Sequence, residues 1–105
     1  MISEKELQEA AQRLAKNFHP QKIILFGSCA RGNMDEHSDV DILVVCPFQG
    51  SRRALMVAMD RTLIGIGFAR DIIVMTPEEF VRDRNIPGTI ARPAWKEGKV
   101  LYERL

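Results

Sequence analysis

Little in this 105-residue sequence suggests a disulfide-stabilised, zinc-stapled or membrane-spanning protein. Its two cysteines, Cys29 and Cys46, form no CxxC pair and are too few for a disulfide framework, so we expect both to remain thiols. The two histidines lie in no metal-ligand spacing, which argues against structural zinc. No apolar run approaches the ~18 residues of a membrane span, and the first residues lack the apolar segment of a signal peptide. We therefore expect a soluble, cytoplasmic protein that contacts no membrane.

An excess of charge of one sign is also missing. Basic and acidic residues number 15 and 14, the formal net charge is +1, and the longest basic run is Arg52-Arg53. A dedicated nucleic-acid-binding protein would carry a basic patch or stripe, so we do not expect nucleic acid as a direct partner. The length and the 46% hydrophobic content fit one domain over residues 1–105.

Helical and strand patterns alternate along the chain, which predicts an α/β sheet domain. Apolar spacing and caps predict helices over 3–18, from 51 to about 65, after 76 and over 89–97, and apolar runs predict strands over 22–26, 40–46, 68–75 and 99–102. The run over 40–46 is almost continuously apolar, so both faces of that strand should be covered. Near the end of the chain, we expect Trp95 and Tyr102 in the core rather than as stacking platforms for bases.

Three aspartates come just before or at the start of apolar strand runs. Asp39 and Asp41 are two residues apart, so their side chains should leave the same face with Cα atoms about 6.5–7 Å apart. Asp71 begins the third strand, and three carboxylates converge if this strand lies beside the second. Such a cluster of oxygen ligands favours Mg²⁺ or a similar hard cation. The structural alternatives are a solvated strand end for the first pair and an ion pair of Asp71 with Arg70 or Arg61.

A small polar segment follows the first strand. Gly27 permits close backbone approach, Ser28 is placed to cap a short helix whose free N–H groups attract anions, and Arg31 adds a permanent positive charge. Capping and phosphate binding use the same geometry, so Ser28 can do both. Arg31 could instead pair with Asp35 or Asp39. Two divalent ions would balance a nucleoside triphosphate of charge about −4, and this arginine would partly offset the carboxylates.

Gly27-Ser28, ten residues and then Asp39-Val-Asp41 resemble the signature of the DNA polymerase β-like nucleotidyltransferase superfamily. Residues 27–41 and the ending over 87–102 are similar to its minimal nucleotidyltransferase branch, so the resemblance covers nearly the whole chain. It implies a single-domain fold like the polymerase β palm, with a mixed sheet flanked by helices. It also implies an enzyme that uses an NTP donor and two Mg²⁺ ions, with Mn²⁺ as an alternative.

The resemblance also implies roles by position. Gly27 and Ser28 would hold the β- and γ-phosphates, and Asp39 and Asp41 would hold the metals. Asp71 would hold the second metal or take the proton of the acceptor hydroxyl. The arginine at position 31 aligns with the Ala-Arg-Gly of the branch, which implies a phosphate contact.

Members of this branch are commonly encoded beside an all-helical HEPN protein as a toxin–antitoxin pair. The resemblance therefore implies a Mg²⁺-dependent enzyme that adds AMP from ATP to a hydroxyl of a HEPN-type toxin. It is also compatible with an oligomeric complex of the enzyme and the toxin. The second hypothesis is an antitoxin that neutralises its helical partner by binding alone. The two differ in one respect: binding would survive Asp39→Asn, whereas transfer would not.

Overall fold

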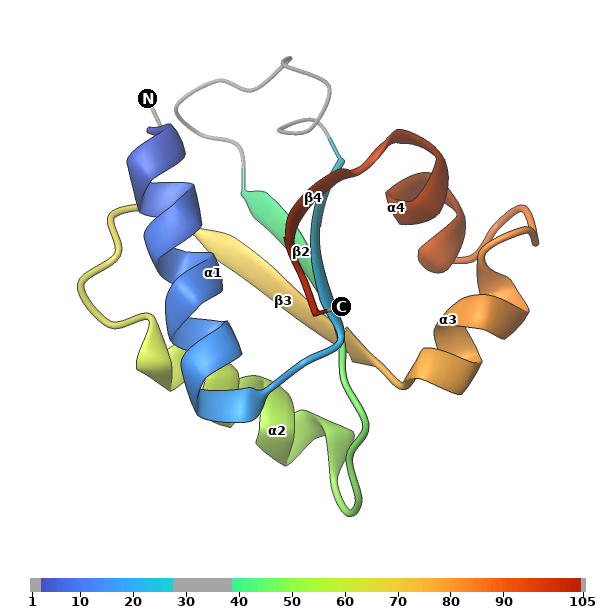
Figure 1. Cartoon of the computed structure of the whole chain (residues 1–105), viewed down its shortest axis with the longest axis horizontal. Helices are drawn as coiled ribbons and strands as arrows, with labels where there is room; N and C mark the ends of the chain where they lie inside the picture. Colours follow the sequence, from blue (N-terminus) through green and yellow to red (C-terminus); the bar gives the residue numbers. More distant parts are fainter. Residues whose placement is uncertain (1–2, 28–38, 105) are drawn as a thin grey trace.

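The chain folds into a four-stranded mixed sheet with helices against both faces (Figure 1). This computed structural model describes residues 3–27 and 39–104. The strands follow the order β3-β2-β1-β4 and are β1 (Lys22–Phe26), β2 (Val40–Val45), β3 (Arg70–Met75) and β4 (Lys99–Glu103). Strand β1 is antiparallel to both of its neighbours, whereas β2 and β3 are parallel. The predicted mixed sheet flanked by helices is thus confirmed.

The helices form two layers. Helices α1 (Glu4–Phe18) and α2 (Arg52–Thr62) cover one face of the sheet, and α3 (Pro77–Asp83) and α4 (Ala91–Glu97) cover the other (Figure 1). Among the described residues, no helix has both the length and the apolar character that a membrane crossing needs. The short helix predicted to begin at Ser28 lies outside the described residues.

Side-chain caps set where three of these helices begin, at Ser3, Ser51 and Thr76. The Thr76 hydroxyl accepts from the Glu79 N–H at 3.1 Å, and the Glu79 carboxylate accepts from the Thr76 N–H at 2.8 Å. This reciprocal pair satisfies two N–H groups that a helix start otherwise leaves unbonded. Helix α1 ends at Phe18, as the following His19-Pro20 sequence predicts. Its C-cap residue His19 adopts a left-handed conformation (φ 52°).

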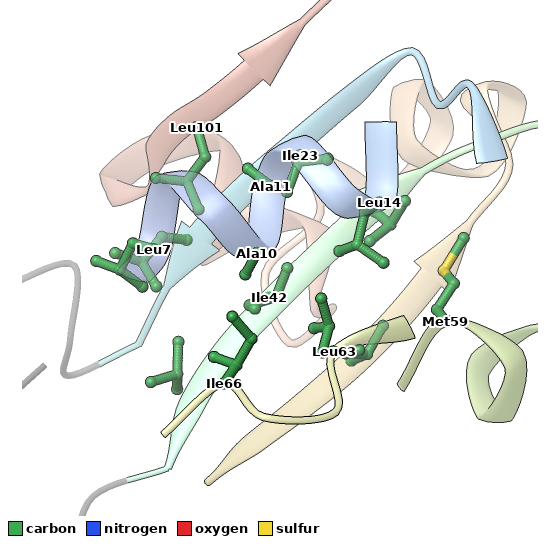
Figure 2. Close-up of a cluster of buried hydrophobic side chains, with 14 of the residues drawn as sticks. Leu7, Ala10, Ala11, Leu14, Ile23, Ile42, Met59, Leu63, Ile66 and Leu101 are labelled. Atoms are coloured by element: carbon green, nitrogen blue, oxygen red, sulfur yellow. The ribbon is translucent and has the colours of Figure 1, made fainter. Parts of the chain in front are cut away.

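Two apolar clusters pack on opposite faces of the sheet. Alternate strand residues supply them because successive side chains in a strand point to opposite faces. The cluster under α1 and α2 includes Ile23, Leu25, Val40, Ile42 and Val44 with Leu7, Leu14, Met59 and Leu63 (Figure 2). The cluster under α3 and α4 includes Ile24, Phe26, Leu43, Val45, Met75 and Phe80. Both faces of β2 are therefore covered, as its continuous apolar run predicts.

The predicted core position of Trp95 is wrong, because this side chain is 44% exposed. Helix α4 buries only the small side chains Ala91 and Ala94, so it approaches the sheet closely and leaves the indole at the rim. There the ring packs edge-on against Phe80, with centroids 5.9 Å apart, and the Arg84 guanidinium lies 4.5 Å from its centre.

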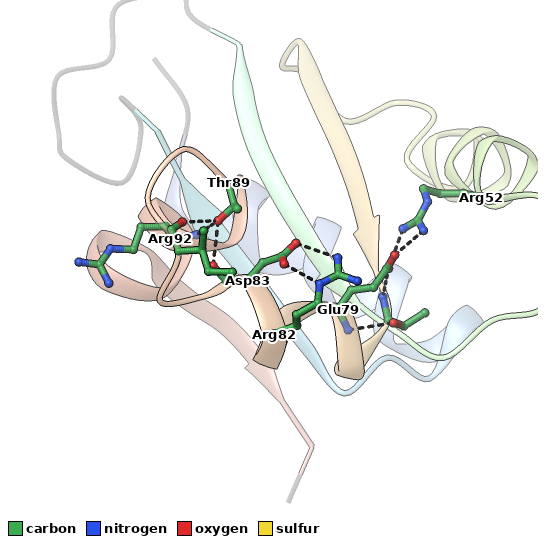
Figure 3. A network of polar contacts seen from close by, with 8 residues as sticks. Arg52, Glu79, Arg82, Asp83, Thr89 and Arg92 are labelled. Carbon is green, nitrogen blue, oxygen red and sulfur yellow. Dashed lines mark hydrogen bonds and ion pairs between the residues drawn. The ribbon is translucent and has the colours of Figure 1, made fainter.

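An arginine joins α2, β3 and α3 at the end of the sheet where β2 and β3 finish. Arg52 donates to both carboxylate oxygens of Glu79, at 2.9 and 2.7 Å, and to the Val74 carbonyl at 2.7 Å (Figure 3). These bonds from Arg52, followed by the N–H of Thr76, lower the pKa of Glu79 to about 2. The ionised carboxylate therefore stabilises the contact between the three elements.

The substitution Glu79→Gln should lower stability in a pH-dependent way. Because the folded-state pKa lies below the usual 4.5, the carboxylate stabilises the fold above pH 4.5 and loses this effect as the pH falls toward 2. At pH 7 we expect a loss of about 1 kcal/mol after solvent screening, which shrinks toward pH 2–3. Urea unfolding at several pH values measures it. Glu78→Gln is the matched control from the same helical turn, and an equal loss at every pH would contradict the assignment.

Candidate functional site

Strand pairing brings the predicted acidic residues to one end of the sheet. In the parallel register of β2 and β3, Asp41 lies directly opposite Asp71, and paired strands are about 4.8 Å apart. Asp39 precedes β2 by one residue and is two residues from Asp41. The condition set by the sequence, that the strand of Asp71 should lie beside that of Asp41, is confirmed.

Gly27 lies against the carboxylate of Asp41. The last residue of β1, Phe26, pairs with Asp41, and Gly27 follows with φ +77°. A Cβ at position 27 would overlap Oδ2 of Asp41. Glycine is therefore required at this position for two reasons: the backbone is left-handed, and the Asp41 carboxylate approaches closely.

This end of the sheet is the open end on the side of α3 and α4. Along β3, the side chains on that side change from exposed Asp71 through half-buried Ile73 to buried Met75. Asp41 is half-buried and Asp39 is exposed. The carboxylates thus lie beyond the part of the sheet that the two short helices cover, where a ligand can reach them.

Among the described residues, no basic side chain compensates the negative charge at this end. Burial raises the pKa of Asp41, and the nearby charges of Asp71 and Asp39 raise it further. In the part of the chain that the structure describes, no ion pair joins Asp41 or Asp71 to a basic side chain. A divalent cation would relieve this repulsion, so the donor set fits such an ion chemically.

The alternative ion pair between Asp71 and Arg70 is absent from the described structure. The Arg70 Nε donates to Oδ1 of Asp60 at 2.8 Å, and Nη2 donates to the Asp60 carbonyl at 3.1 Å. Neighbouring strand residues point to opposite faces, so Arg70 turns toward α2 and Asp71 turns away from it. Asp71 is therefore left available for a ligand.

Ser28 and Arg31 lie outside the described residues, so the phosphate cradle beyond Gly27 stays a prediction. Within residues 3–27 and 39–104, no group of three or more His, Cys, Asp or Glu side chains is arranged to hold a metal ion. Metal binding at the aspartates therefore also stays a prediction.

An open groove that the sequence analysis missed borders the site. It has a volume of about 500 Å³ at the outer edge of β3 and is lined by Arg53, Met56, Val57, Asp60, Arg61, Arg70, Asp71 and Ile72. The signal was present in the sequence, because Arg53, Val57 and Arg61 recur every four residues and so share one face of α2. The helical periodicity of the apolar residues pointed instead to the opposite, buried face of this helix.

Residues 5–100 match the family model described as a nucleotidyltransferase domain. The chain belongs to this family. A provisionally named protein adenylyltransferase from Methanocaldococcus jannaschii is 34% identical over 104 residues, which cover 97% of this chain and 100% of the relative. The match confirms the enzyme class that the motif resemblance implied: this chain is a nucleotidyltransferase.

Two solved structures resemble the fold of this nucleotidyltransferase. A provisionally named nucleotidyltransferase from Sulfolobus solfataricus superposes with a TM-score of 0.66 and 25% identity, covering 95% of this chain and 79% of its own. A crystal structure described as a toxin–antitoxin with AMP-PNP gives a TM-score of 0.59 and 20% identity over 92% and 73%. The second likeness supports the fold alone.

The contact between Gly27 and Asp41 predicts a coupled pair of substitutions. Gly27→Ala should destabilise the nucleotidyltransferase by about 2 kcal/mol or more, from the left-handed backbone and from overlap with Asp41. In an Asp41→Ala background the overlap disappears and only the backbone cost remains, so the loss should fall to about 1 kcal/mol. Chemical denaturation of the four proteins measures the coupling, and additive losses would show that the two residues do not touch.

Proposed function

We propose that this nucleotidyltransferase transfers AMP from ATP to a hydroxyl side chain of a partner protein, and that the partner is a HEPN-type helical toxin which the transfer neutralises. The observation that carries the proposal is the meeting of Gly27, Asp41 and Asp71 at one open end of the sheet. We also propose that residues 1–105 act as a single domain, since one sheet organises both apolar clusters.

In this proposal the aspartates hold Mg²⁺, with two ions expected, and the segment after β1 holds the triphosphate. The metal-holding residues are Asp39, Asp41 and Asp71, and the phosphate-binding residues are Gly27, Ser28 and Arg31. When bound, Mg²⁺ would neutralise phosphate charge and stabilise the charge that develops on the leaving group. The uncompensated negative charge around Asp41 supports this assignment.

The chemistry is an in-line displacement at the α-phosphorus of ATP. The acceptor oxygen forms a bond to this phosphorus while the bond to the oxygen bridging to the β-phosphate breaks, and pyrophosphate leaves. The hydroxyl proton passes to the carboxylate of Asp71, which is exposed and, in the described structure, pairs with no cation. The acceptor retains AMP through a phosphodiester bond. Catalysis rests mainly on positioning and on charge stabilisation.

Two comparisons support a protein acceptor. The relative from M. jannaschii carries the name of a protein adenylyltransferase and aligns with almost the whole chain. The structural neighbour described as a toxin–antitoxin shares the fold alone with this chain, and its description is one reason why we propose a toxin as the partner.

The substitution Asp41→Asn tests the site. It should abolish labelling of the partner by ATP that carries the label at its α-phosphate, because one metal-holding charge is lost. Mg²⁺ and ATP together should raise the melting temperature of the wild type but not of this variant. Unfolding free energy at pH 7 should stay equal or rise by up to ~1 kcal/mol, since repulsion at a half-exposed group is relieved. Asp83→Asn, on α3 away from the site, is the matched control and should keep full activity.

The outcomes separate the competing functions. If partner inhibition survives Asp41→Asn while labelling is lost, the protein neutralises its partner by binding alone. Efficient transfer to free nucleotides, tRNA or a small molecule in the absence of a protein partner would overturn the proposed acceptor. If Asp41→Asn unfolds at much lower denaturant concentration, this residue is structural and the site assignment fails.

A further inference from the structure

The groove at the outer edge of β3 adjoins the proposed site through Asp71, which forms part of its wall. Strand β3 is the edge strand of the sheet, with α2 below it (Figure 1). Because no strand lies outside β3 in the described structure, a chain in the groove can reach over this edge to the carboxylate of Asp71. The groove therefore lies where an acceptor would have to approach.

In the part of the chain that the structure describes, two positive charges in the groove have no ion-pair partner. Arg70 is paired with Asp60, as described above. Arg53 and Arg61 are both exposed, and the structure gives neither an acidic partner among the residues it describes. They lie on one face of α2, two turns apart, with Val57 between them. An occupant with two spaced negative charges would complement them.

The floor of the groove is apolar and borders a free strand edge, two features that favour binding of a polypeptide. Met56, Val57 and Ile72 line it, and Val57 is 43% exposed. The carbonyls of Ala69, just before β3, and of Met75, at its end, accept hydrogen bonds from the N–H groups of Val40 and Cys46 and so face β2. The Val74 carbonyl accepts from Arg52 and faces away from β2. The peptide groups of even-numbered residues therefore face the free edge. Arg52 occupies this edge at Val74, which leaves the edge at Ile72, near Asp71, for an incoming chain.

We propose that this groove binds the acceptor protein through an extended acidic segment, whose carboxylates pair with Arg53 and Arg61 while its hydroxyl reaches Asp71; this inference rests on the proposed function. Backbone pairing at a strand edge supplies affinity, and the side chains on either side supply selectivity. A nucleic acid fits less well, because Asp60 and Asp71 would repel a continuous chain of phosphates and the floor is apolar.

The test uses short fluorescent peptides with one tyrosine flanked by leucine and by aspartate, asparagine or lysine. Binding is measured by anisotropy in the presence of Mg²⁺ and a non-hydrolysable ATP analogue, and transfer is measured with labelled ATP. The wild type should bind and label the aspartate peptide about three- to tenfold better than the asparagine peptide at low salt. This preference should weaken as ionic strength rises.

The variants assign the preference to the groove. Arg53→Gln/Arg61→Gln should abolish it, and Arg53→Glu/Arg61→Glu should reverse it toward the lysine peptide. The control pair Arg82→Gln/Lys96→Gln removes the same charge from α3 and α4 and should leave the preference intact. ATP-dependent thermal stabilisation, measured in every variant, reports on folding and nucleotide binding separately.

Each remaining outcome overturns one specific claim. Equal handling of the three peptides by the wild type, or no binding of any, overturns the acidic-segment proposal while leaving the nucleotide site standing if Mg²⁺ and ATP still stabilise the protein. Displacement of the aspartate peptide by single-stranded RNA, which itself becomes labelled, would identify the groove as a nucleic-acid site. Absence of ATP stabilisation in the wild type would instead refute the proposed function.

Discussion

The register of the three strands β1, β2 and β3 is the constraint on which both the core and the site depend. Asp41 pairs with Phe26 on one side and with Asp71 on the other. A slip of one residue would turn Asp41 toward α1 and α2, into an apolar cluster where a carboxylate is costly. The alternation that buries Val40 and Ile42 therefore also directs Asp41 to the opposite, open face. Packing and chemistry are specified by the same pairing.

The two ends of the sheet shift the pKa values of their carboxylates in opposite directions. At one end, Arg52 and the cap at Thr76 lower the pKa of Glu79 and tie three elements together. At the other end, burial and two neighbouring acids raise the pKa of Asp41. The first arrangement stabilises the fold, whereas the second works against it and is offset by the apolar clusters on both faces of β2. Unfavourable charge concentrated at one place is typical of a site that awaits a charged ligand.

The edge of β3 runs from the end of the sheet that holds the aspartates along the side of the molecule. An uncovered strand edge is usually a liability because it offers unpaired peptide groups. Here Arg52 blocks the edge at Val74, while the groove beside Ile72 stays open and carries two arginines from α2 that form no ion pair with any described residue. The edge can therefore act as a selective surface for an acceptor instead of a general site of aggregation.

The sequence by itself determined the local elements and the candidate acids. Apolar spacing, the cap at Thr76 and the continuous run of β2 correctly indicated helices, strands and a strand covered on both faces. The resemblance of the residues from Gly27 to Asp41 to a known family signature implied the enzyme class. Only the tertiary structure decided that β3 lies beside β2, that Arg70 pairs with Asp60, that Trp95 stays at the rim, and that α2 and β3 enclose a groove. The reason is physical: periodicity within one segment encodes which side is buried, but which segments meet depends on packing between residues far apart in the chain.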